Sequence, residues 1–235
     1  IELFYARIQK ALEKEKGAKL KIGIASKIAK ATKKVGIDTS DLFFGKIKEA
    51  FGGSIRLIIS GAAGIDPVII ENMNKYGIQT FQGYGLTECS PIVICNSDKD
   101  SKHASIGRPI PEVEAKLVNC DENGIGELCI KGPMVMLGYY KNEEATKAVF
   151  DYDGWFHTGD LARVDKDGFY YICGRSKNVI VTRNGKNVYP EELEALLMKE
   201  PAVKECMVVE AKDDKDNAVV KARIFPDVQA LSQEN

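Results

Sequence analysis

Apolar residues recur at helical spacing through the first fifty positions of this 235-residue chain. Residues three and four apart lie on one face of an α-helix, so this recurrence predicts amphipathic helices. The first two apolar stripes consist of Ile1, Phe4, Tyr5, Ile8 and Leu12, and of Ile24, Ile28, Ala31 and Val35. A third, short helix is predicted over 42–51, with Ser40 or Asp41 as its cap. Each of these helices has one apolar stripe and must pack against other elements.

The pattern then changes to that of strands. A short apolar run, Ile55–Ile59, is typical of a buried strand and leads into the small residues 60–64. A helix is predicted over 67–76, because Pro67 is favourable in a first helical turn, and a second strand is predicted over 78–81. Strand, helix and strand at this spacing predict a parallel pair, and ligands bind beyond the carboxyl ends of such strands. The loops 60–64 and 82–88 both leave those ends.

The second half of the chain has many short strands separated by turns. Such a pattern predicts a small barrel or sandwich of antiparallel strands. The predicted elements are strands at 112–118, 126–131 and 134–140, a helix at 142–150 capped by Asn142, a hairpin of 161–164 with 168–172, a helix from Pro190, and strands at 203–210 and 218–225 joined by the charged turn 212–217.

Composition is that of a soluble globular protein, with 44% apolar and 29% charged residues. The net charge of −1 hides a gradient, because residues 1–50 hold twelve basic and six acidic side chains and so carry +6. Such a segment is usually the wet face of amphipathic helices, although weak association with an anionic membrane stays open. No apolar run is long enough for a membrane span and no signal peptide opens the sequence, so we expect a cytoplasmic protein.

Cysteine and histidine usage does not predict a zinc site. The six cysteines show no C-x-x-C spacing, and the only histidines are His103 and His157. Reduced and mostly buried thiols are therefore expected. Cys89 is the one thiol to watch, because it directly follows Glu88, a candidate ligand.

Two motifs flank the predicted hairpin. His157–Asp160 delivers a carboxylate from a glycine-containing loop, and Gly174–Lys177 follows about one hairpin later. The Asp-Gly step at 167 and 168 is a strong hairpin signal, and a hairpin brings its two ends together. Asp160 and Arg175 can therefore face one small site, in which the carboxylate accepts hydrogen bonds from vicinal hydroxyls, as in a ribose. The alternative is an ordinary hairpin with a surface ion pair.

A third motif, Gln82–Glu88, follows the second predicted strand. Its glycines, Gly83 and Gly85, stand where the backbone must approach a ligand closely. Thr87 offers a hydroxyl, and the carboxylate of Glu88 is the hard oxygen ligand that a phosphate-bound Mg²⁺ takes.

In their order and separations, YGLTE, HTGD and GRSKNVIVTRNGKNVYPEE resemble the adenylate-forming (AMP-binding) enzymes, and among them the fatty acyl-CoA synthetases. The resemblance covers the chain from about Phe51 onward and implies an α/β with α+β fold class. It implies that residues 1–111 are the C-terminal part of a large α/β domain, 112–175 an antiparallel, barrel-like subdomain, and 176–235 a hinge with a truncated small C-terminal α+β domain.

The resemblance also implies roles for single residues. Thr87 would contact the α-phosphate of ATP, Glu88 the magnesium, and Tyr84 with its neighbouring backbone the adenine. Lys177 would be the hinge, and Gly185 would approach the CoA tunnel. Other nucleotide-binding positions are Gly61, Ala62, Ala63, Gln82, Gly83, Gly85, Asp160, Ile172 and Arg175. The family usually has a further Gly and a Pro in the first loop, where this chain has Ala62-Ala63-Gly64, so the contacts of that loop are in doubt.

The activity implied is an acid–thiol ligation in two steps, with fatty acid, ATP and CoA as partners and neither nucleic acid nor another protein. A carboxylate would attack ATP to give an acyl adenylate and pyrophosphate, and the CoA thiol would then displace AMP. The family's phosphate-gripping loop would precede residue 1 and its adenylation lysine would follow residue 235, so residues 1–235 alone are expected to be inactive.

Two other functions stay open. A module that loads an amino acid onto a carrier protein generally has Pro where this chain has Leu86, and residues 186–190 look like the acyl-CoA ligase side. A non-catalytic nucleotide-binding or membrane-docking module is the other alternative.

Overall fold

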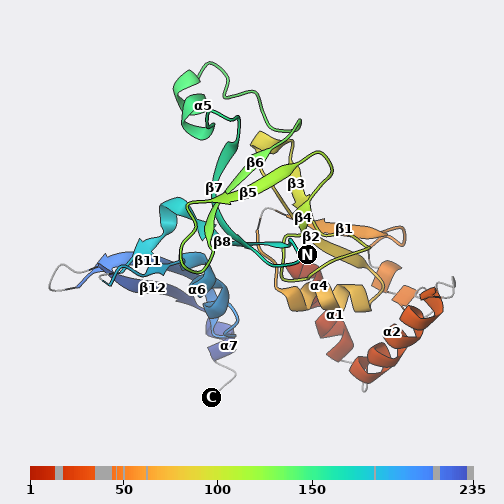
Figure 1. Cartoon of the computed structure of the whole chain (residues 1–235). Coiled ribbons are helices and arrows are strands. Elements are labelled where there is room, and N and C mark those ends of the chain that lie inside the picture. The colour runs from red at the N-terminus through yellow and green to blue at the C-terminus, as the bar shows by residue number, and fades with distance from the viewer. Residues whose placement is uncertain are drawn as a thin grey trace. The chain divides into compact units, whose positions relative to one another are not determined.

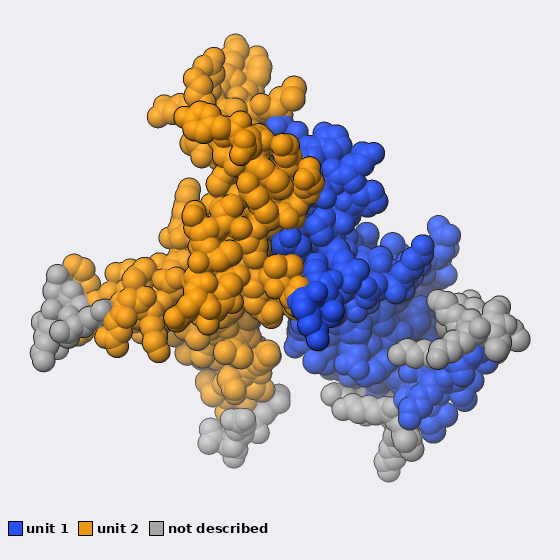
Figure 2. Space-filling view, viewed as in Figure 1, with its two compact units in different colours: residues 1–113, 132–136, 166–170 blue, residues 114–131, 137–165, 171–235 orange. Residues whose placement is uncertain are grey.

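The computed structural model describes residues 1–13, 18–34, 44–45, 47–49, 51–61, 63–182, 184–213 and 218–231. The chain divides into two compact units. The first holds residues 1–113, 132–136 and 166–170, and the second holds 114–131, 137–165 and 171–235 (Figure 2). No described helix combines the length and the apolar character needed to cross a membrane.

Among its described elements, the first unit contains the helices α1, α2 and α4, further helical residues at 44–45 and 47–49, and a four-stranded sheet (Figure 1). The helices are α1 (Glu2–Glu13), α2 (Ala18–Lys34) and α4 (Pro67–Lys75). The sheet has the order β1-β2-β3-β4, with β1 (Leu57–Ser60), β2 (Gln79–Gly85), β3 (Ile92–Cys95) and β4 (Arg108–Pro109). β1 and β2 are parallel, as predicted, and the following pairs are antiparallel.

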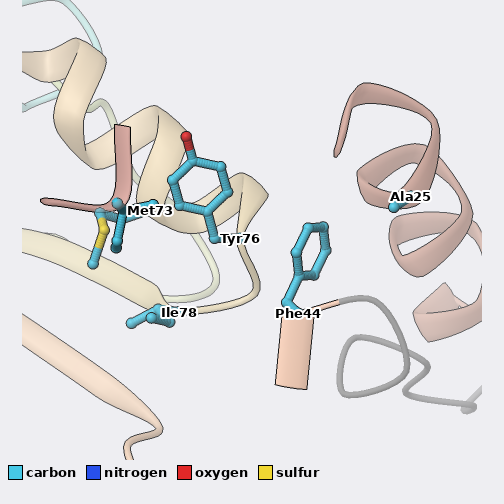
Figure 3. Packing of buried hydrophobic residues seen from close by; sticks show 6 residues of the cluster. Ala25, Phe44, Met73, Tyr76 and Ile78 are labelled. Atoms are coloured by element: carbon cyan, nitrogen blue, oxygen red, sulfur yellow. The ribbon is translucent and has the colours of Figure 1, made fainter. Parts of the chain in front are cut away.

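One face of each helix meets in a single core, but the stripe predicted for α2 was wrong, because Ile24 and Ile28 are 53% and 43% exposed. Ile8 of α1, Ala25 of α2 and Met73 of α4 are buried in one cluster with Phe44, Tyr76 and Ile78. Figure 3 shows Phe44 and Tyr76 near each other, with ring centroids 6.4 Å apart. Hydrogen bonds from Gln9 to the Tyr76 hydroxyl (2.7 Å) and from Asn72 to the Tyr5 hydroxyl (2.6 Å) join α1 to the end of α4. The predicted caps Ser40 and Asp41 and the stripe residue Val35 lie outside the described residues.

The predicted buried strand is half uncovered. β1 forms the edge of its sheet, and Leu57 and Ile59 are each 45% exposed. The strand itself was predicted correctly, but within the described residues it is only partly buried.

The second unit contains an antiparallel sheet with the order β5-β6-β7-β8. Its strands are β5 (Glu114–Val118), β6 (Gly126–Lys131), β7 (Phe156–Val164) and β8 (Tyr170–Arg175), and α5 (Glu143–Val149) lies between β6 and β7 in sequence. The first residue of β8, Tyr170, clusters with the first unit. Within the described strands this sheet is open, so the predicted barrel-like region is an antiparallel sheet without barrel closure.

The strand predicted over 134–140 is wrong. Gly138 has φ +152° and packs against Thr146, so that a Cβ there would lie 2.7 Å from the Thr146 methyl carbon. The backbone N–H of Val135 bonds to Gly132 within a turn. These local contacts replace the ladder hydrogen bonds that a strand would make.

The other described elements of the second unit follow β8 along the chain. These are β9 (Ile180–Val181), β10 (Asn187–Val188), α6 (Pro190–Leu197), β11 (Val203–Lys212), β12 (Ala218–Pro226) and α7 (Val228–Leu231). β9 pairs with β10 and β11 with β12, both antiparallel. α6 begins at Pro190 as predicted, and residues 214–217 of the predicted charged turn lie outside the described residues.

Candidate functional site

Two loops follow the adjacent carboxyl ends of β1 and β2. Ser60 pairs with Gln82 in the parallel register, so Gly61 and Gly83 come next to each other. A Cβ on Gly61 would lie 3.7 Å from the Gly83 carbonyl oxygen. The first loop borders an open hollow of about 300 Å³, lined by Ile1, Glu2, Leu3, Ser60, Gly61, Ala63, Gly64 and Ile65. Ala62 lies outside the described residues.

Gly83 and Gly85 were predicted in the second loop, but they lie within β2, and its pairing with β3 requires them. A Cβ on Gly85 would lie 1.7 Å from the Pro91 carbonyl oxygen, and one on Gly83 would lie 3.2 Å from the Cys95 sulfur. The prediction gave these glycines a ligand as the reason for close approach. The structure supplies a reason within the protein, because β3 and the residue before it occupy the space.

Thr87 and Glu88 stand on a tight turn. The 3₁₀ segment η1 (Thr87–Cys89) is closed by the hydrogen bond from the Leu86 N–H to the Pro91 carbonyl, 2.8 Å long. The Glu88 carbonyl accepts a 2.7 Å bond from the Met136 N–H. Thr87 is exposed and Glu88 half-buried, so the turn presents a hydroxyl and a carboxylate side by side in the sequence.

Cys89 follows on the inner side of this turn and is fully buried. Burial, and then the neighbouring charge of Glu88, raises the pKa of its thiol to about 11. A thiol with such a pKa is protonated at neutral pH, and the thiolate is the nucleophilic form. Cys89 is therefore a structural residue rather than a nucleophile.

Asn96 was predicted only as part of a turn. Its side chain holds the backbone at Gln82 in place. Its side-chain amide donates to the carbonyl oxygens of Gln82 (3.1 Å) and Ser105 (2.7 Å), and its own oxygen accepts the Lys102 N–H (2.9 Å). Both Gln82 and Asn96 are buried. Nothing in the local sequence signals these contacts, because the partners meet only through the pairing of β2 with β3.

The predicted meeting of Asp160 and Arg175 is present in the second unit. The Arg175 Nε lies 2.8 Å from the Asp160 Oδ1, where β7 and β8 come together. The Asp160 side chain is 9% exposed and that of Arg175 is 53% exposed. A buried carboxylate is thus paired with a guanidinium that partly faces solvent.

Hydrogen bonds of the neighbouring residues fix the backbone that carries this carboxylate. Gly159 has φ +71°, a conformation that favours glycine. The Gly159 N–H donates to the Glu127 Oε1 (3.1 Å), while the Thr158 hydroxyl donates to the Leu128 carbonyl and accepts the Asp160 N–H. Glu127 lies 32 positions before Gly159, so the sequence gave no signal of its role.

Tyr84 is half-buried on β2 in the first unit. The other predicted residues lie on the surface of the second unit. Ile172 is 38% exposed on β8, and Lys177 is exposed in the 3₁₀ segment η2 (Ser176–Asn178). Gly185, at φ +75°, sits in the predicted tight turn, where its N–H bonds to the Thr182 carbonyl (2.8 Å). Because Glu88 belongs to the first unit, its convergence with Asp160 and Arg175 stays a prediction.

Comparison with protein families matches residues 8–140 to the AMP-binding enzyme model. Among curated proteins, the long-chain-fatty-acid–CoA ligase of Escherichia coli O6:H1 is 40% identical over 189 residues, which are 77% of this chain and 33% of the relative. Long-chain-fatty-acid–CoA ligase 6 of Rattus norvegicus is 33% identical over 198 residues, 81% of this chain and 28% of the relative. The chain thus spans about a third of the length of these curated relatives.

Solved structures give the same likeness. O-succinylbenzoate CoA synthetase from Bacillus subtilis, with its acyl-adenylate intermediate, has a TM-score of 0.68 at 29% identity over 82% of this chain and 43% of that one. ATP-bound MatB from Rhodopseudomonas palustris has a TM-score of 0.67 at 29% identity over 83% of this chain and 43% of that one.

Proposed function

Because this chain belongs to the AMP-binding enzyme family, we propose that the whole protein activates a fatty carboxylate with ATP and then transfers the acyl group to CoA. The names of the curated relatives support the choice of acid and acceptor. The ATP-bound and acyl-adenylate-bound structural neighbours support the nucleotide.

The pairing of Asp160 with Arg175 is the observation that carries this proposal. A carboxylate that is only 9% exposed must keep hydrogen-bonded partners, because an unpaired buried charge is costly. Arg175 supplies one such partner at 2.8 Å and keeps part of its donor fork toward solvent. We assign to the two side chains the binding of a ribose, with Asp160 accepting from a hydroxyl.

Thr87 and Glu88 supply the phosphate side of the proposed site. Both are oxygen donors, and their turn is held by the Leu86–Pro91 and Met136–Glu88 backbone hydrogen bonds. Hard oxygen donors are the ligands that Mg²⁺ prefers, so the residues fit the ion. When bound, Mg²⁺ would offset negative charge on the phosphates. Thr87 would donate its hydroxyl to an α-phosphate oxygen.

The first proposed step joins two anions. A carboxylate oxygen forms a bond to the α-phosphorus while the bond to the β-phosphate oxygen breaks and pyrophosphate leaves. The protein contributes mainly by holding the reactants in line and by donating hydrogen bonds to the charged oxygens. In the second step the CoA sulfur attacks the acyl carbon, AMP leaves, and the thiol proton passes to solvent.

The segment from Lys177 to Gly185 is proposed to serve the second step. Lys177 is exposed and sits on a single 3₁₀ turn, and a hinge needs only a few residues that absorb backbone rotation. Gly185 stands at the tip of the β9–β10 turn. We propose that rotation at Lys177 moves this tip toward the CoA thiol.

The proposal is tested by fatty acid-dependent exchange of pyrophosphate into ATP, in the full-length polypeptide that carries this chain. We expect the D160N variant to lose about ten- to a hundredfold in kcat/KM for ATP, the usual effect of a hydrogen bond to a charged group. The exposed acid Asp153 gives a matched control, and D153N should exchange at the wild-type rate. Equal activity of D160N and D153N would contradict the ribose role.

The carboxylic acid that is activated and the thiol that accepts the acyl group are tested in separate assays. A fatty acid that supports exchange, while amino acids do not, would favour the ligase over a carrier-loading module. Thioester formation with CoA would then be measured directly. Residues 1–235 assayed alone should give no exchange, and turnover by them would show that the chemistry was misplaced.

Domain limits and location complete the proposal. We assign 1–111 to the large α/β domain, 112–175 to the antiparallel subdomain and 176–235 to the hinge and small domain. Limited proteolysis with cleavage near residues 111 and 175 would support these limits. A cytoplasmic location is proposed, to be tested by cell fractionation.

A further inference from the structure

Three side chains with metal-binding atoms lie on one face of the β6–β7 pair. Cys129 pairs directly with His157 across the two strands, and Glu127 precedes Cys129 by two residues on β6. Residues two apart on a strand point to the same face, as do directly opposed residues. The Glu127 carboxylate, the Cys129 sulfur and a His157 ring nitrogen all lie within 4.8 Å of one another. The sequence alone did not reveal this cluster, because strand pairing brings together residues that are far apart in the sequence.

The separations suit a tetrahedral ion. The His157 Nδ1 lies 3.5 Å from the Cys129 Sγ and 2.9 Å from the Glu127 Oε2. Ordinary Zn–S and Zn–N bonds at a tetrahedral angle place sulfur and nitrogen about 3.6 Å apart. The corresponding oxygen–nitrogen separation is about 3.4 Å, so Glu127 would move by roughly half an ångström.

In Glu127 and in His157, the polar atom that would not bind the ion also lies near a partner. The Glu127 Oε1 accepts the Gly159 N–H at 3.1 Å, so that Oε2 is the oxygen nearer to His157. The other ring nitrogen of His157, Nε2, lies 3.8 Å from the Asp151 Oδ2. A histidine ligand commonly has a carboxylate facing its second nitrogen, an arrangement that fixes the ring and raises its basicity.

Asp151 is itself held in place. Its Oδ1 accepts the N–H groups of Asp153 (3.0 Å) and Trp155 (2.8 Å). Its Oδ2 lies 3.7 Å from the Lys116 Nζ. This Nζ lies over the Trp155 ring, 4.2 Å from the ring centroid. The carboxylate therefore has a fixed position from which it can support His157.

The local charge matches a divalent ion. Burial, and then the charge of Glu127, raises the pKa of the Cys129 thiol to about 12, so this thiol loses its proton only when an ion binds. With Cys129 deprotonated, Glu127, Cys129 and Asp151 carry three negative charges, and Lys116 carries one positive charge. The sum of −2 is the complement of a divalent cation. Thiolate and imidazole ligands together favour Zn²⁺ over Mg²⁺ or Ca²⁺, which prefer oxygen.

We propose that Glu127, Cys129 and His157 bind Zn²⁺ with the fourth position open to water. The site shares no ligand with the proposed magnesium site and does not depend on the proposed ligase activity. A bound ion would cross-link β6 to β7 three residues before Asp160 and would stabilise that part of the second unit.

Titration of the metal-free protein with Co²⁺, a spectroscopic substitute for Zn²⁺, tests the proposal. We expect one equivalent to bind with a thiolate-to-cobalt charge-transfer band, which Zn²⁺ then abolishes by displacement. The C129S variant should lose the band. H157Q and E127Q should each weaken binding more than about tenfold, because even residues that only support a ligand commonly cost ten- to a hundredfold.

The chain offers matched controls. Cys120 is exposed and His103 half-buried, and both lie outside the cluster. C120S and H103Q should therefore bind Co²⁺ as the wild type does. A band that disappears in C120S, or that persists in C129S, would overturn the proposal, as would the absence of any band in the wild type.

A folding defect is detected independently. Cys129 is fully buried, so far-ultraviolet circular dichroism must show that C129S is folded. If C129S is unfolded, H157Q replaces it. Zn²⁺ should raise the unfolding midpoint of the wild type and leave that of H157Q unchanged. Equal Zn²⁺ shifts in both proteins would show that the cluster is hydrogen-bonded only and binds no metal.

Discussion

An added Cβ at Gly85 would lie 1.7 Å from the Pro91 carbonyl oxygen and 2.6 Å from its carbonyl carbon. Both atoms are backbone, so no side-chain rotation relieves the overlap. We expect Gly85→Ala to lower the free energy of unfolding by about 3 kcal/mol, the upper end for overpacked sites. Urea unfolding would measure the loss.

Gly64 is the control for this substitution. It has no atom within 4 Å of an added Cβ and no left-handed φ. Gly64→Ala should therefore be neutral or slightly stabilising through the unfolded chain. Equal midpoints for the two variants would show that the Pro91 contact yields at little cost.

Buried thiols, Cys89 and Cys173 among them, make stability depend on alkaline pH. Burial raises the pKa values of Cys89 and Cys173 to about 11, with smaller contributions from Glu88 and Glu192. Their ordinary value is 9.0, so above pH 9 the unfolded chain loses protons that the folded chain retains. This term is fully favourable below pH 9 and is lost as pH rises toward 11.

We therefore expect the unfolding midpoint to fall between pH 9 and 11, and to fall less in the C89A/C173A variant. Alkylation at pH 8 gives a second measurement. The exposed Cys120 should react first, whereas Cys89 and Cys173 should react only after unfolding. Rapid labelling of Cys89 in the folded chain would contradict its assignment as a structural thiol.

At this scale, sequence reasoning found residues that local motifs mark. The Asp-Gly hairpin signal led to the Asp160–Arg175 pair, which the structure contains at 2.8 Å. Sequence reasoning missed Asn96 and Glu127, because their hydrogen bonds join residues 14 and 32 positions apart in the sequence. Such contacts depend on strand register, which a single sequence rarely determines.

Among the elements, α4 has the clearest start. The Asp66 side chain accepts the Val68 N–H at 2.8 Å, and Pro67 follows at the first helical position. Removal of this cap in Asp66→Ala should cost about 1 kcal/mol, whereas Asp66→Ser should retain most of the stability. Thermal unfolding of both variants would compare them, and equal losses would contradict the cap's contribution.

The segment after η2 is hydrogen-bonded to the loop between β5 and β6. The Tyr189 hydroxyl donates to the Asp121 Oδ2 at 3.0 Å, and burial, followed by this bond, raises the pKa of Tyr189 to about 12. We expect Tyr189→Phe to cost about 1 kcal/mol and to speed proteolysis between β8 and α6. Tyr152, which is fully exposed, supplies the control, and Tyr152→Phe should change neither property.

Elements were predictable where local chemistry decides them. Proline at the start of α4 and α6 and the Asn142 cap of α5, which accepts the Ala145 N–H, were sufficient signals. The predicted strand over 134–140 failed because the backbone turns locally, with the Val135 N–H bonded to Gly132 and Gly138 lying against Thr146. An apolar run alone therefore predicts neither a strand nor burial, since Leu137 and Tyr140 are 102% and 88% exposed.

For the whole molecule, the resemblance carried by YGLTE, HTGD and GRSK is confirmed by the family match over 8–140 and by the curated relatives. The α/β with α+β class is likewise confirmed. Local motifs are sufficient for this because they stand in a fixed order along the chain. The meeting of Glu88 with Asp160 and Arg175 depends instead on how two compact units are arranged, and it stays a prediction.

The edge position of β1 affects how this chain behaves in a concentrated solution. Among the described strands β1 pairs only with β2, and an unpaired strand edge with apolar residues is a template for strands from other molecules. If strands of different molecules pair in this way, light scattering should rise with protein concentration as oligomers form. The substitution Leu57→Lys should reduce this rise, because it places a charge on the edge strand. We therefore expect association of copies, rather than unfolding, to set the highest usable concentration of this chain.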